Sequence, residues 1–508
     1  MRFSRSAGIL MHPTSLPGKH GIGELGKQAL AFVDLLVESG QSLWQILPLG
    51  PTGYGDSPYA CFSALAGNPL LIDLTQLAEE GDITAEDLSE TPNFPTDRVD
   101  FGPVITFKAR ILQRAAQAFR ERATGDQRMA FEAFCHENSD WLDDFALFMA
   151  LKDAHGGAVW NTWKRELVTR QPEALQAWRM RLDETVFAQR YYQFRFFQQW
   201  EALKAYANER GIQIIGDIPI FVAYDSVDVW AHPELFYLDK DLRPTEVAGV
   251  PPDYFSPTGQ LWGNPLYRWD VMAQADYAWW VRRFEQTLTT VDIVRLDHFR
   301  GFAAYWSVPA DEETAVNGHW VPGPGTAFFA FIKGALGELP IIAEDLGHIT
   351  DDVLELREAF SLPGMNVLQF AFASDAGNPY LPHNLAHNSV IYTGTHDNDT
   401  TVGWFKTRET QEREDCLRYL GPTDEPIHWA LIRLAYRSVA DLAITPLQDV
   451  LGLGSEARMN TPGKLGNNWS WRFELEQILP RYRAKLNEMA LTYARKEPEE
   501  KQARPKWM

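Results

Sequence analysis

The segment VDIVRLDHF (residues 291–299) decides the fold class, because it is an apolar run that ends in charged side chains. Seven further runs share its length and most of its character: AGILMHP (7–13), SLWQILPL (42–49), IQIIGDIPIF (212–221), LPIIAEDL (339–346), MNVLQFAF (365–372), NSVIYTGTHD (388–397) and DLAITPLQDV (441–450). Continuous apolar runs of this kind are typical of parallel strands covered on both faces. We therefore interpret them as the strands of one parallel sheet.

Helical patterns separate most of these runs. Residues 26–39 place apolar side chains at helical spacing, residues 183–209 form a long aromatic-rich amphipathic stretch, and residues 425–440 precede the last run. Alternating strands and helices predict an α/β fold, and eight strands favour a closed (β/α)₈ TIM barrel. We expect residues 1–508 to form a single catalytic barrel domain.

Two gaps between the predicted strands, 50–211 and 222–290, are too long for a single helical crossover. We expect an inserted helical subdomain at about 75–180, after the second strand. After the third strand we expect a loop-rich subdomain at about 222–290 that covers the cleft. Its segment AGVPPDYFSPTGQLWGNP (248–265) is rich in Pro and Gly, which predicts a rigid surface loop rather than a helix or strand.

The composition narrows the class of partner and compartment. A net charge of −21 disfavours nucleic acid and anionic membranes as partners. The cysteines Cys61, Cys135 and Cys416 are odd in number and form no CxxC pair, which argues against a disulfide framework or a zinc site. The apolar run before His12 is too short for a signal peptide or membrane span. We predict a cytoplasmic protein.

Several predicted strands end in a carboxylate, at the end of a barrel where chemistry takes place. They deliver Asp217, Asp297, Glu344, Asp345 and Asp397. A single acid in such a position is more often a helix cap than a functional group. Carboxylates from four strand ends converging on one mouth are hard to explain as caps, because each is costly to desolvate without a partner or a function.

Converging carboxylates indicate either metal chemistry or glycoside chemistry. His298 and His396 each adjoin one of the acids, so a metal-dependent barrel hydrolase stays open as an alternative. Retaining glycoside chemistry needs two carboxyl groups about 5 Å apart, and Asp297 and Glu344 come from neighbouring predicted strands. This second hypothesis requires neither a metal nor a cofactor, and we predict neither.

The two acids need opposite protonation states. Arg295 lies two residues before Asp297 on the same face of a strand, so we expect it to keep Asp297 ionised as a nucleophile. A general acid must be protonated, so we expect Asp345 and the charge of Asp297 to raise the pKa of Glu344.

Four strand-end segments resemble the motifs of α-amylase-like enzymes: GDIPIF (216–221), VRLDHFRG (294–301), IIAEDLG (341–347) and YTGTHDND (392–399). More specifically, the chain resembles the amylomaltase family, the 4-α-glucanotransferases or disproportionating enzymes. The segments that carry this resemblance are GILMHPTSLPGKHGIGELG (8–26), WQILPLGPTGYGDSPY (44–59), AGNPLLIDL (66–74), AGVPPDYFSPTGQLWGNP (248–265) and RMNTPG (458–463). They span nearly the whole chain, in the compact form of the family without an added amino-terminal domain.

The resemblance implies a role for each matching residue. Asp297 matches the nucleophile, Glu344 the general acid/base and Asp397 the carboxylate that stabilises the transition state. The residues that match sugar contacts are Tyr59, Asp217, Arg295, His298, Asp345, His396 and Asn468. Asp253, Phe255, Gln260 and Trp262 match a loop that arches over the cleft. Tyr54 and Phe101 match a remote glucan-binding groove, where Phe101 replaces a tyrosine of some relatives and keeps the stacking surface alone.

The resemblance also implies the reaction. The expected activity is transfer of a 1,4-α-glucan segment between maltooligosaccharides or longer α-1,4-glucans, as donor and acceptor, through a covalent glycosyl-enzyme. Cyclic glucans are a further expected product. Transfer wins over hydrolysis if the loop at 248–265 excludes water and holds the acceptor. Besides the metal-dependent enzyme, the alternatives are a hydrolase or branching enzyme of the same barrel class and a catalytically silent glycan-binding barrel.

Overall fold

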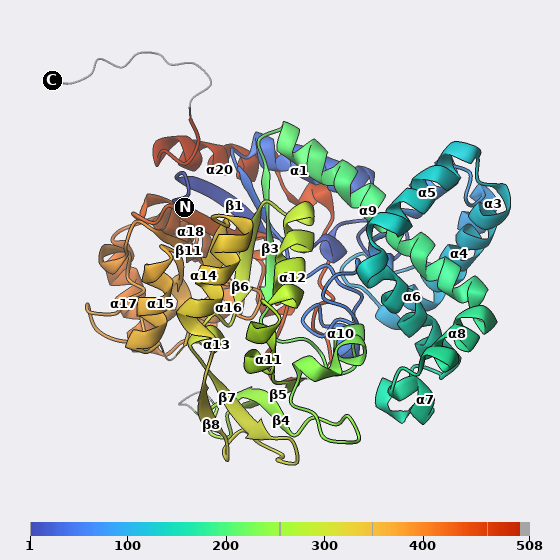
Figure 1. The fold of residues 1–508 in the computed structure, drawn as a ribbon. Helices are drawn as coiled ribbons and strands as arrows, with labels where there is room; N and C mark the ends of the chain where they lie inside the picture. The colour runs from blue at the N-terminus through green and yellow to red at the C-terminus, as the bar shows by residue number, and fades with distance from the viewer. Residues whose placement is uncertain (1, 253–255, 348, 465, 498–508) are drawn as a thin grey trace.

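The core of the protein is a closed barrel of eight parallel strands in the order β1-β12-β11-β10-β9-β6-β3-β2 (Figure 1). The computed structural model describes residues 2–252, 256–347, 349–464 and 466–497. The barrel strands are β1 (Ser6–Leu10), β2 (Leu43–Gln45), β3 (Gln213–Pro219), β6 (Ile293–Asp297), β9 (Ile341–Ala343), β10 (Gly364–Val367), β11 (Ser389–Tyr392) and β12 (Leu442–Pro446).

The predicted barrel is confirmed, because each of the eight apolar runs overlaps one of these strands. Their residues are almost all buried, as expected for strands that face a packed interior on one side and helices on the other. The register also sets the site: Asp217 on β3 pairs with Arg295 on β6, and Leu296 on β6 pairs with Ala343 on β9.

Helices surround the barrel and connect most of its strands. They are α1 (Lys27–Glu38), α9 (Asp183–Glu209), α11 (Trp269–Gln274), α12 (Ala278–Thr290), α14 (Gly325–Leu336), α15 (Asp351–Ala359), α16 (Thr401–Thr407), α17 (Thr410–Leu420), α18 (Ile427–Arg437), α19 (Leu447–Leu451) and α20 (Pro480–Thr492). The connection from β10 to β11, which is described throughout, contains only the 3₁₀ turns η6 (Leu368–Phe370) and η7 (Pro382–Asn384). None of the described helices is long and apolar enough to cross a membrane.

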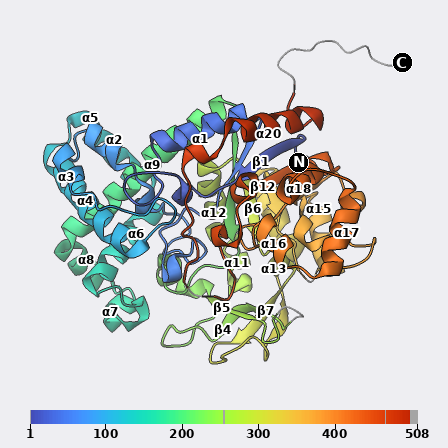
Figure 2. The ribbon, with the colours of Figure 1, turned by 180° about the vertical axis from the view of Figure 1, so that it is seen from behind.

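A group of helices leaves the barrel between β2 and β3 and lies at one side of it (Figures 1 and 2). Its members are α2 (Leu74–Glu79), α3 (Ala85–Ser89), α4 (Phe101–Arg122), α5 (Gly125–Glu137), α6 (Ser139–Ala154), α7 (Arg165–Val168) and α8 (Pro172–Arg181). Helices α4, α5, α6 and α8 pack against the long helix α9, which runs from this group back to the barrel. Helix α9 therefore packs against both the helical group and the barrel strand β3.

The segment at 248–265 contains strands, so its prediction as a loop without regular structure is wrong in part. Strands β4 (Glu246–Val250) and β5 (Gln260–Pro265) pair antiparallel with each other. β4 also pairs with β7 (Ala304–Pro309), which in turn pairs with β8 (His319–Pro322). The partner strands come from residues beyond β6, so this sheet depends on contacts between distant segments that local propensity does not reveal.

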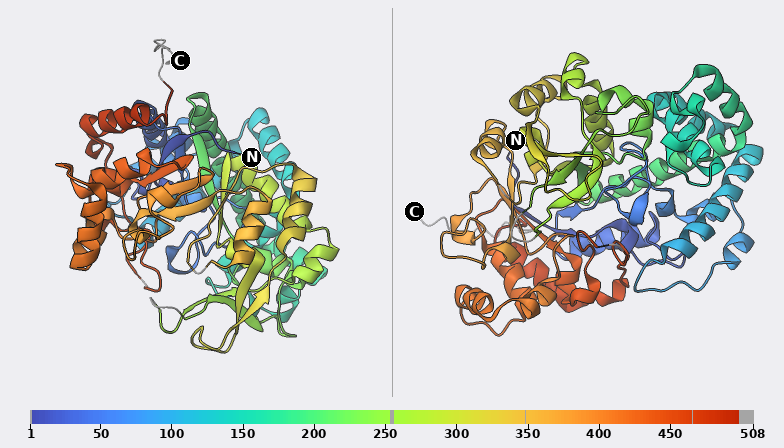
Figure 3. Two further views of the ribbon diagram at one scale, coloured as in Figure 1. Left: turned by 90° about the vertical axis from the view of Figure 1, so that its left-hand side faces the viewer. Right: turned by 90° about the horizontal axis from the view of Figure 1, so that it is seen from below.

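This four-stranded sheet projects from the end of the barrel where the parallel strands terminate (Figure 1). Seen from below, the sheet, the helical group and the loops of the last third of the chain surround the barrel mouth (Figure 3). The mouth is thus walled by three separate parts of the sequence.

A buried arginine lies where the barrel strands β1 and β12 begin. Arg495, of which 2% is exposed, donates hydrogen bonds of 2.8 to 3.2 Å to the backbone carbonyls of Ser6, Ala435, Tyr436, Ala440 and Asp441. Burial, reinforced by the nearby Arg5, lowers the pKa of Arg495 to about 9. The guanidinium therefore ties the carboxyl end of the chain to β1, β12 and the end of α18.

Replacing Arg495 by methionine should destabilise the fold without touching the mouth. The variant removes all five hydrogen bonds of the buried guanidinium, and we expect the protein to lose about 3 kcal/mol of stability. Thermal unfolding of Arg495→Met beside Arg481→Met, an exposed arginine on α20, measures this loss. Equal melting temperatures for the two variants would show that the guanidinium contributes nothing.

Candidate active site

Two carboxyl groups lie side by side where β6 and β9 end. Asp297 is the last residue of β6, and Glu344 follows the last residue of β9. The pairing continues past both strands: the amide of Glu344 donates to the carbonyl of Leu296 at 3.0 Å, and the amide of His298 donates to Glu344 Oε2 at 2.7 Å. Because paired strands lie about 4.8 Å apart, the two acids face a common point in the mouth.

A buried arginine holds Asp297. Arg295 Nη1 lies 2.9 Å from Asp297 Oδ1 and 2.6 Å from Asp217 Oδ2, and 4% of the Arg295 side chain is exposed. The Asp297 side chain is 28% exposed, so it contacts Arg295 on one side and remains accessible on the other. Asp297 therefore combines a charge-assisted contact with Arg295 and access to the cleft.

Asp217 is the more deeply buried of the two carboxylates that contact Arg295. Its Oδ2 also accepts a hydrogen bond of 2.8 Å from the hydroxyl of Tyr59, whereas its buried Oδ1 has no hydrogen-bond partner among the described residues. Burial raises the pKa of Asp217 to about 7, and the charge of Arg295 opposes that rise. The cluster thus places one guanidinium between two carboxyl groups of different burial.

Glu344 has the surroundings of an acid rather than a nucleophile. Burial raises its pKa well above its usual value, and the charge of Asp297 raises it further. Arg295 and the backbone amide of His298 act in the opposite direction, and Asp345 adds a smaller rise. The expected rise in the pKa of Glu344 is confirmed, with burial as a larger cause than either neighbouring charge.

Asp397 enters the mouth from the loop that follows β11. Its side chain is 46% exposed, its Oδ1 accepts a hydrogen bond of 2.6 Å from Asn460 Nδ2, and His396 Nε2 lies 3.4 Å from the same oxygen. Its backbone carbonyl accepts a hydrogen bond of 2.5 Å from Arg458 Nη2. Asp397 is therefore the most open of the three acids, held from the side by the segment around residue 460.

Burial lowers the pKa of three histidines of the mouth. Burial lowers the pKa of His298 to about 4, and burial together with His396 lowers that of His12 to about 3. Burial also lowers the pKa of His396. The ring of His396 stacks on Tyr59 at 5.1 Å between centroids, so these groups present flat surfaces and hydrogen-bonding nitrogens rather than extra positive charge.

The loop over the cleft reaches the mouth through Trp262. Its indole meets the ring of His298 edge to face at 4.8 Å and donates a hydrogen bond of 3.1 Å to Gln260 Oε1. Trp262 is 38% exposed. Asp253 and Phe255 lie outside the described residues. The second half of the loop thus lies beside the residue that follows the predicted nucleophile.

Three of the predicted contacts lie apart from the three acids. Asp345 is buried, and its carboxylate accepts hydrogen bonds from Arg357 and from the backbone amide of Met365. Asn468 bonds within its own segment, to the amide of Thr461 and the carbonyl of Lys464. These contacts orient the two side chains toward neighbouring backbone. Gln260 is the third, and it reaches the mouth only through its hydrogen bond from Trp262.

Tyr54 and Phe101, which match the remote glucan-binding groove, differ in how far their rings are exposed. Tyr54 is 75% exposed in the 3₁₀ turn η2 (Tyr54–Asp56), where its ring can accept a stacking partner. Phe101, the first residue of α4, packs in part against Val99 and Val104.

Several residues of the mouth were not predicted from the sequence. Asn460 lies in RMNTPG (458–463), a segment that resembles the family, but its hydrogen bond to Asp397 is a tertiary contact. Trp469 packs against the rings of Tyr59 and His396 at 5.7 and 5.9 Å. Met365 on β10 accepts a hydrogen bond from Arg295. No sequence pattern marks these three, because each acts through a partner far away in the chain.

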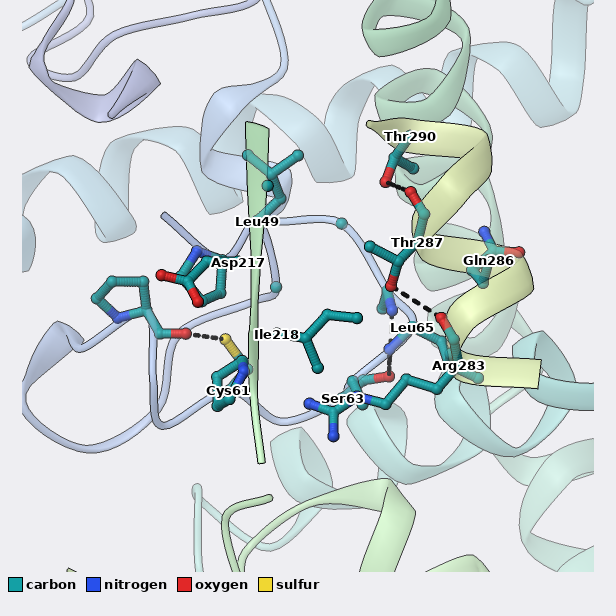
Figure 4. A pocket seen from close by; sticks show the side chains of 18 of the residues that line it. Leu49, Cys61, Ser63, Leu65, Asp217, Ile218, Arg283, Gln286, Thr287 and Thr290 are labelled. Carbon is teal, nitrogen blue, oxygen red and sulfur yellow. Dashed lines mark hydrogen bonds between the residues drawn. The ribbon is translucent and has the colours of Figure 1, made fainter. Parts of the chain in front are cut away.

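A hollow of about 90 Å³ extends along β3 (Figure 4). Ile218, Arg283 and Thr287 line it on one side of the strand, and Tyr59 and Asp217 line it as well. The hollow therefore reaches the ion-pair cluster of the mouth. The carboxylate cluster therefore defines the candidate site.

The described residues contain no group of three or more His, Cys, Asp or Glu side chains placed to hold a metal ion. They do contain Asp297 in an ion pair with Arg295, Glu344 beside it with a raised pKa, and Asp397 from the loop after β11, in a mouth bordered by aromatic rings. Such a set can attack a sugar's anomeric carbon on one face and protonate its leaving oxygen on the other.

Comparison with known proteins decides the family. The family model described as 4-alpha-glucanotransferase matches residues 11–477. The chain belongs to the 4-alpha-glucanotransferase family. A 4-alpha-glucanotransferase of Synechocystis is 54% identical over 93% of this chain and 95% of its own length. That of Thermus thermophilus is 53% identical over 96% of this chain and 99% of its own length.

Solved structures of the 4-alpha-glucanotransferase family agree. The amylomaltase from Streptococcus agalactiae, in complex with acarbose, superposes with a TM-score of 0.94 at 42% identity over 97% of this chain and 100% of the other. The amylomaltase from Corynebacterium glutamicum, 17% identical with a TM-score of 0.79, shares the fold. The activity of this chain is therefore glycosyl transfer of the 4-alpha-glucanotransferase class, and a hydrolase or branching enzyme is not favoured.

Proposed function

We propose that the chain moves a segment of an α-1,4-glucan from one maltooligosaccharide to the 4-hydroxyl of another by a retaining double displacement in which Asp297 and Glu344 act in turn. The observation that supports this most is their placement at the ends of paired strands with opposite surroundings: Asp297 in an ion pair with Arg295, and Glu344 half-buried with a raised pKa. The double displacement requires these opposite protonation states.

In the first step a carboxylate oxygen of Asp297 attacks the anomeric carbon of the donor sugar. The bond from that carbon to the glycosidic oxygen breaks, and the oxygen takes the proton of Glu344 as the reducing-end fragment leaves. In the second step the Glu344 carboxylate removes the proton of the acceptor's 4-hydroxyl. That oxygen then displaces Asp297, which restores both carboxyl groups.

The other side chains of the mouth hold the reacting sugar. Asp397 is the carboxylate with the most room for sugar hydroxyls, His396 supplies a ring nitrogen beside it, and His298 supplies another ring beside Asp297. Arg295 forms an ion pair with Asp297, and Tyr59 offers a ring platform while its hydroxyl donates a hydrogen bond to Asp217. Asp345 and Asn468 act on the substrate through the segments to which they bond.

The inserted parts of the chain adapt the barrel to long substrates. We assign the helices at about 75–180 to a subdomain beside the cleft, and residues 222–290 to a subdomain that covers it. Within the latter, we assign Gln260 and Trp262 to an arch over the bound glucan. Tyr54 and Phe101 form a remote site where a long glucan stacks on the exposed ring of Tyr54 and the half-buried ring of Phe101.

The donors and acceptors are maltooligosaccharides and longer α-1,4-glucans, and long donors can also close into cyclic products. The relative crystallised with acarbose supports a glucan-sized cleft. A cytoplasmic location is supported by the three cysteines, all of which are free thiols.

Incubation with maltotriose tests the proposal. A transferase produces free glucose and a ladder of longer maltooligosaccharides while the number of reducing ends stays nearly constant. A hydrolase increases the reducing ends in step with glucose. Product chromatography together with a reducing-end assay separates the two outcomes, and a rise in reducing ends equal to the glucose released would contradict transfer.

Replacing Trp262 by alanine should shift the products from transfer toward hydrolysis. The indole covers His298 beside the nucleophile, so its loss admits water to the glycosyl-enzyme. We expect the ratio of hydrolysis to transfer to rise roughly fivefold. Trp320→Ala is the matched control, because Trp320 is also 38% exposed but lies on β8 of the same sheet and contacts Arg300 instead. An equal ratio in both variants would remove Trp262 from the water barrier.

A further inference from the structure

The loop that carries Asp397 is tied at both ends to one buried carboxylate. The loop runs from Thr393, directly after β11, to Thr401, the first residue of α16, and Asp397 lies four residues from each. Asp449, on α19 beyond the end of β12, accepts hydrogen bonds of 2.6 Å from Thr393 Oγ1 and 2.7 Å from Thr401 Oγ1, both at Oδ2. Its Oδ1 accepts the backbone amide of Thr401 at 2.7 Å.

The hydrogen bonds of this carboxylate all go to the two ends of the loop. Asp449 is 1% exposed, and both threonines are fully buried. A buried carboxylate costs free energy unless hydrogen bonds compensate for the lost water, and here three donors do so. Two of the three donors are side-chain hydroxyls at the ends of one loop, which is more than a local helix cap would need.

The loop itself has little regular structure to hold it. Residues 393–400 contain neither helix nor strand. Within the loop, Asn398 Oδ1 accepts hydrogen bonds from the amide and hydroxyl of Thr395, which fixes its tip. A loop held by few backbone hydrogen bonds opens more easily than the strands around it. Arg458 and Asn460 hold Asp397 from one side, and the end points of the loop set where Asp397 meets them.

The space beneath the loop is small. A hollow lined by Leu10 of β1, Pro446 of β12, Asp449, Thr395 and Thr400 has a volume of about 20 Å³. That volume holds about one water molecule. The loop therefore rests on packed side chains, and a shift of its ends moves Asp397 rather than being absorbed by empty space.

We propose that Asp449 is a positioning residue for the transfer reaction, which sets the place of Asp397 in the mouth through Thr393 and Thr401. This inference rests on the proposed role of Asp397. Asp449 contacts no reacting atom. Its effect is to hold two hydroxyls so that the carboxylate midway between them meets the sugar where charge develops.

Isosteric valine variants test the inference. Thr393→Val and Thr401→Val each remove one hydroxyl and keep the side-chain shape. We expect each to lower kcat about fivefold and the double variant about 30-fold, with KM for maltotriose changed less than about twofold, because misplacement costs the transition state more than the bound substrate. Affinity for acarbose should weaken in parallel with kcat/KM.

Two further variants separate positioning from a loss of stability. Asp441→Asn changes a buried carboxylate before the start of β12, where Asp441 pairs with Arg2 far from the mouth. It should lower the melting temperature at wild-type kcat. Asp449→Asn keeps an acceptor for the Thr401 amide and can donate to the hydroxyls, so it should retain more activity than the double valine variant.

The decisive measurement places the double valine change in an Asp397→Asn background. If Asp449 acts through Asp397, the valines should cause no further loss there, whereas a general structural effect would add to it. A full additional loss overturns the inference, and so does wild-type kcat in the double valine variant. Wild-type activity of Asp397→Asn alone would instead overturn the proposed role of Asp397.

Discussion

Replacement of Asp297 by asparagine should lower kcat on maltotriose by about 10⁴-fold or more. The amide is a poor nucleophile and cannot form the ester intermediate on which both half-reactions depend. It also removes one carboxylate from Arg295, which then keeps its short contact to Asp217 alone. Because the ion pair between Arg295 and Asp217 remains, we expect Asp297→Asn to fold normally and still bind acarbose.

Two measurements check this result. Turnover on maltotriose and on a maltosyl fluoride, whose leaving group needs no proton, should fall by the same factor. Asp292→Asn serves as the control, because Asp292 lies at the opposite end of β6, where it bonds Asn208 and the amide of Ile214. Substantial turnover of either donor by Asp297→Asn would assign the nucleophile to another carboxylate.

Replacement of Glu344 by glutamine should lower kcat on maltotriose by about 10³-fold, in the range expected for loss of a general acid. Glutamine keeps the shape and can still accept the amide of His298, but it has no proton to give the leaving oxygen. On the fluoride donor, the loss in the rate of glycosyl-enzyme formation should be smaller by about tenfold or more. Glu338→Gln, an exposed acid before β9, should match the wild type.

The same variant has a distinct pH signature. Glu344 must be protonated for the first step, and burial and the charge of Asp297 raise its pKa well above the usual value. Activity should therefore persist to higher pH than for an ordinary glutamate, and kcat/KM should fall as the pH rises through this pKa. The alkaline limb should be absent from Glu344→Gln assayed on the fluoride. Its persistence there would mean that another group controls it.

Sequence patterns predicted the barrel because burial of parallel strands leaves a local signature. Strand β3 lies within IQIIGDIPIF and β6 within VDIVRLDHF, and the apolar length of each run follows from being covered on both faces. The polar end of each run then locates the mouth, so Asp217, Asp297, Glu344 and Asp397 could be named from the strand pattern alone.

The accessory sheet could not be predicted in the same way. Strand β5 is largely exposed, contains a glycine and ends in a proline, so its local signal is that of a loop. It becomes a strand because β4 pairs with it, and β4 is fixed in turn by β7 from beyond the fourth barrel strand. Pairing between segments so distant in the chain has no periodic trace in either one.

Short stretches of the chain are enough to specify the closed barrel and the acids at its mouth, because strand burial and strand ends are local properties. How those acids are held depends on the folded chain: Arg295 lies between Asp217 and Asp297, Asn460 bonds Asp397, and Asp449 bonds both ends of the Asp397 loop. Hydrogen bonds and burial act through distance in space, and folding brings these partners together from separate parts of the sequence.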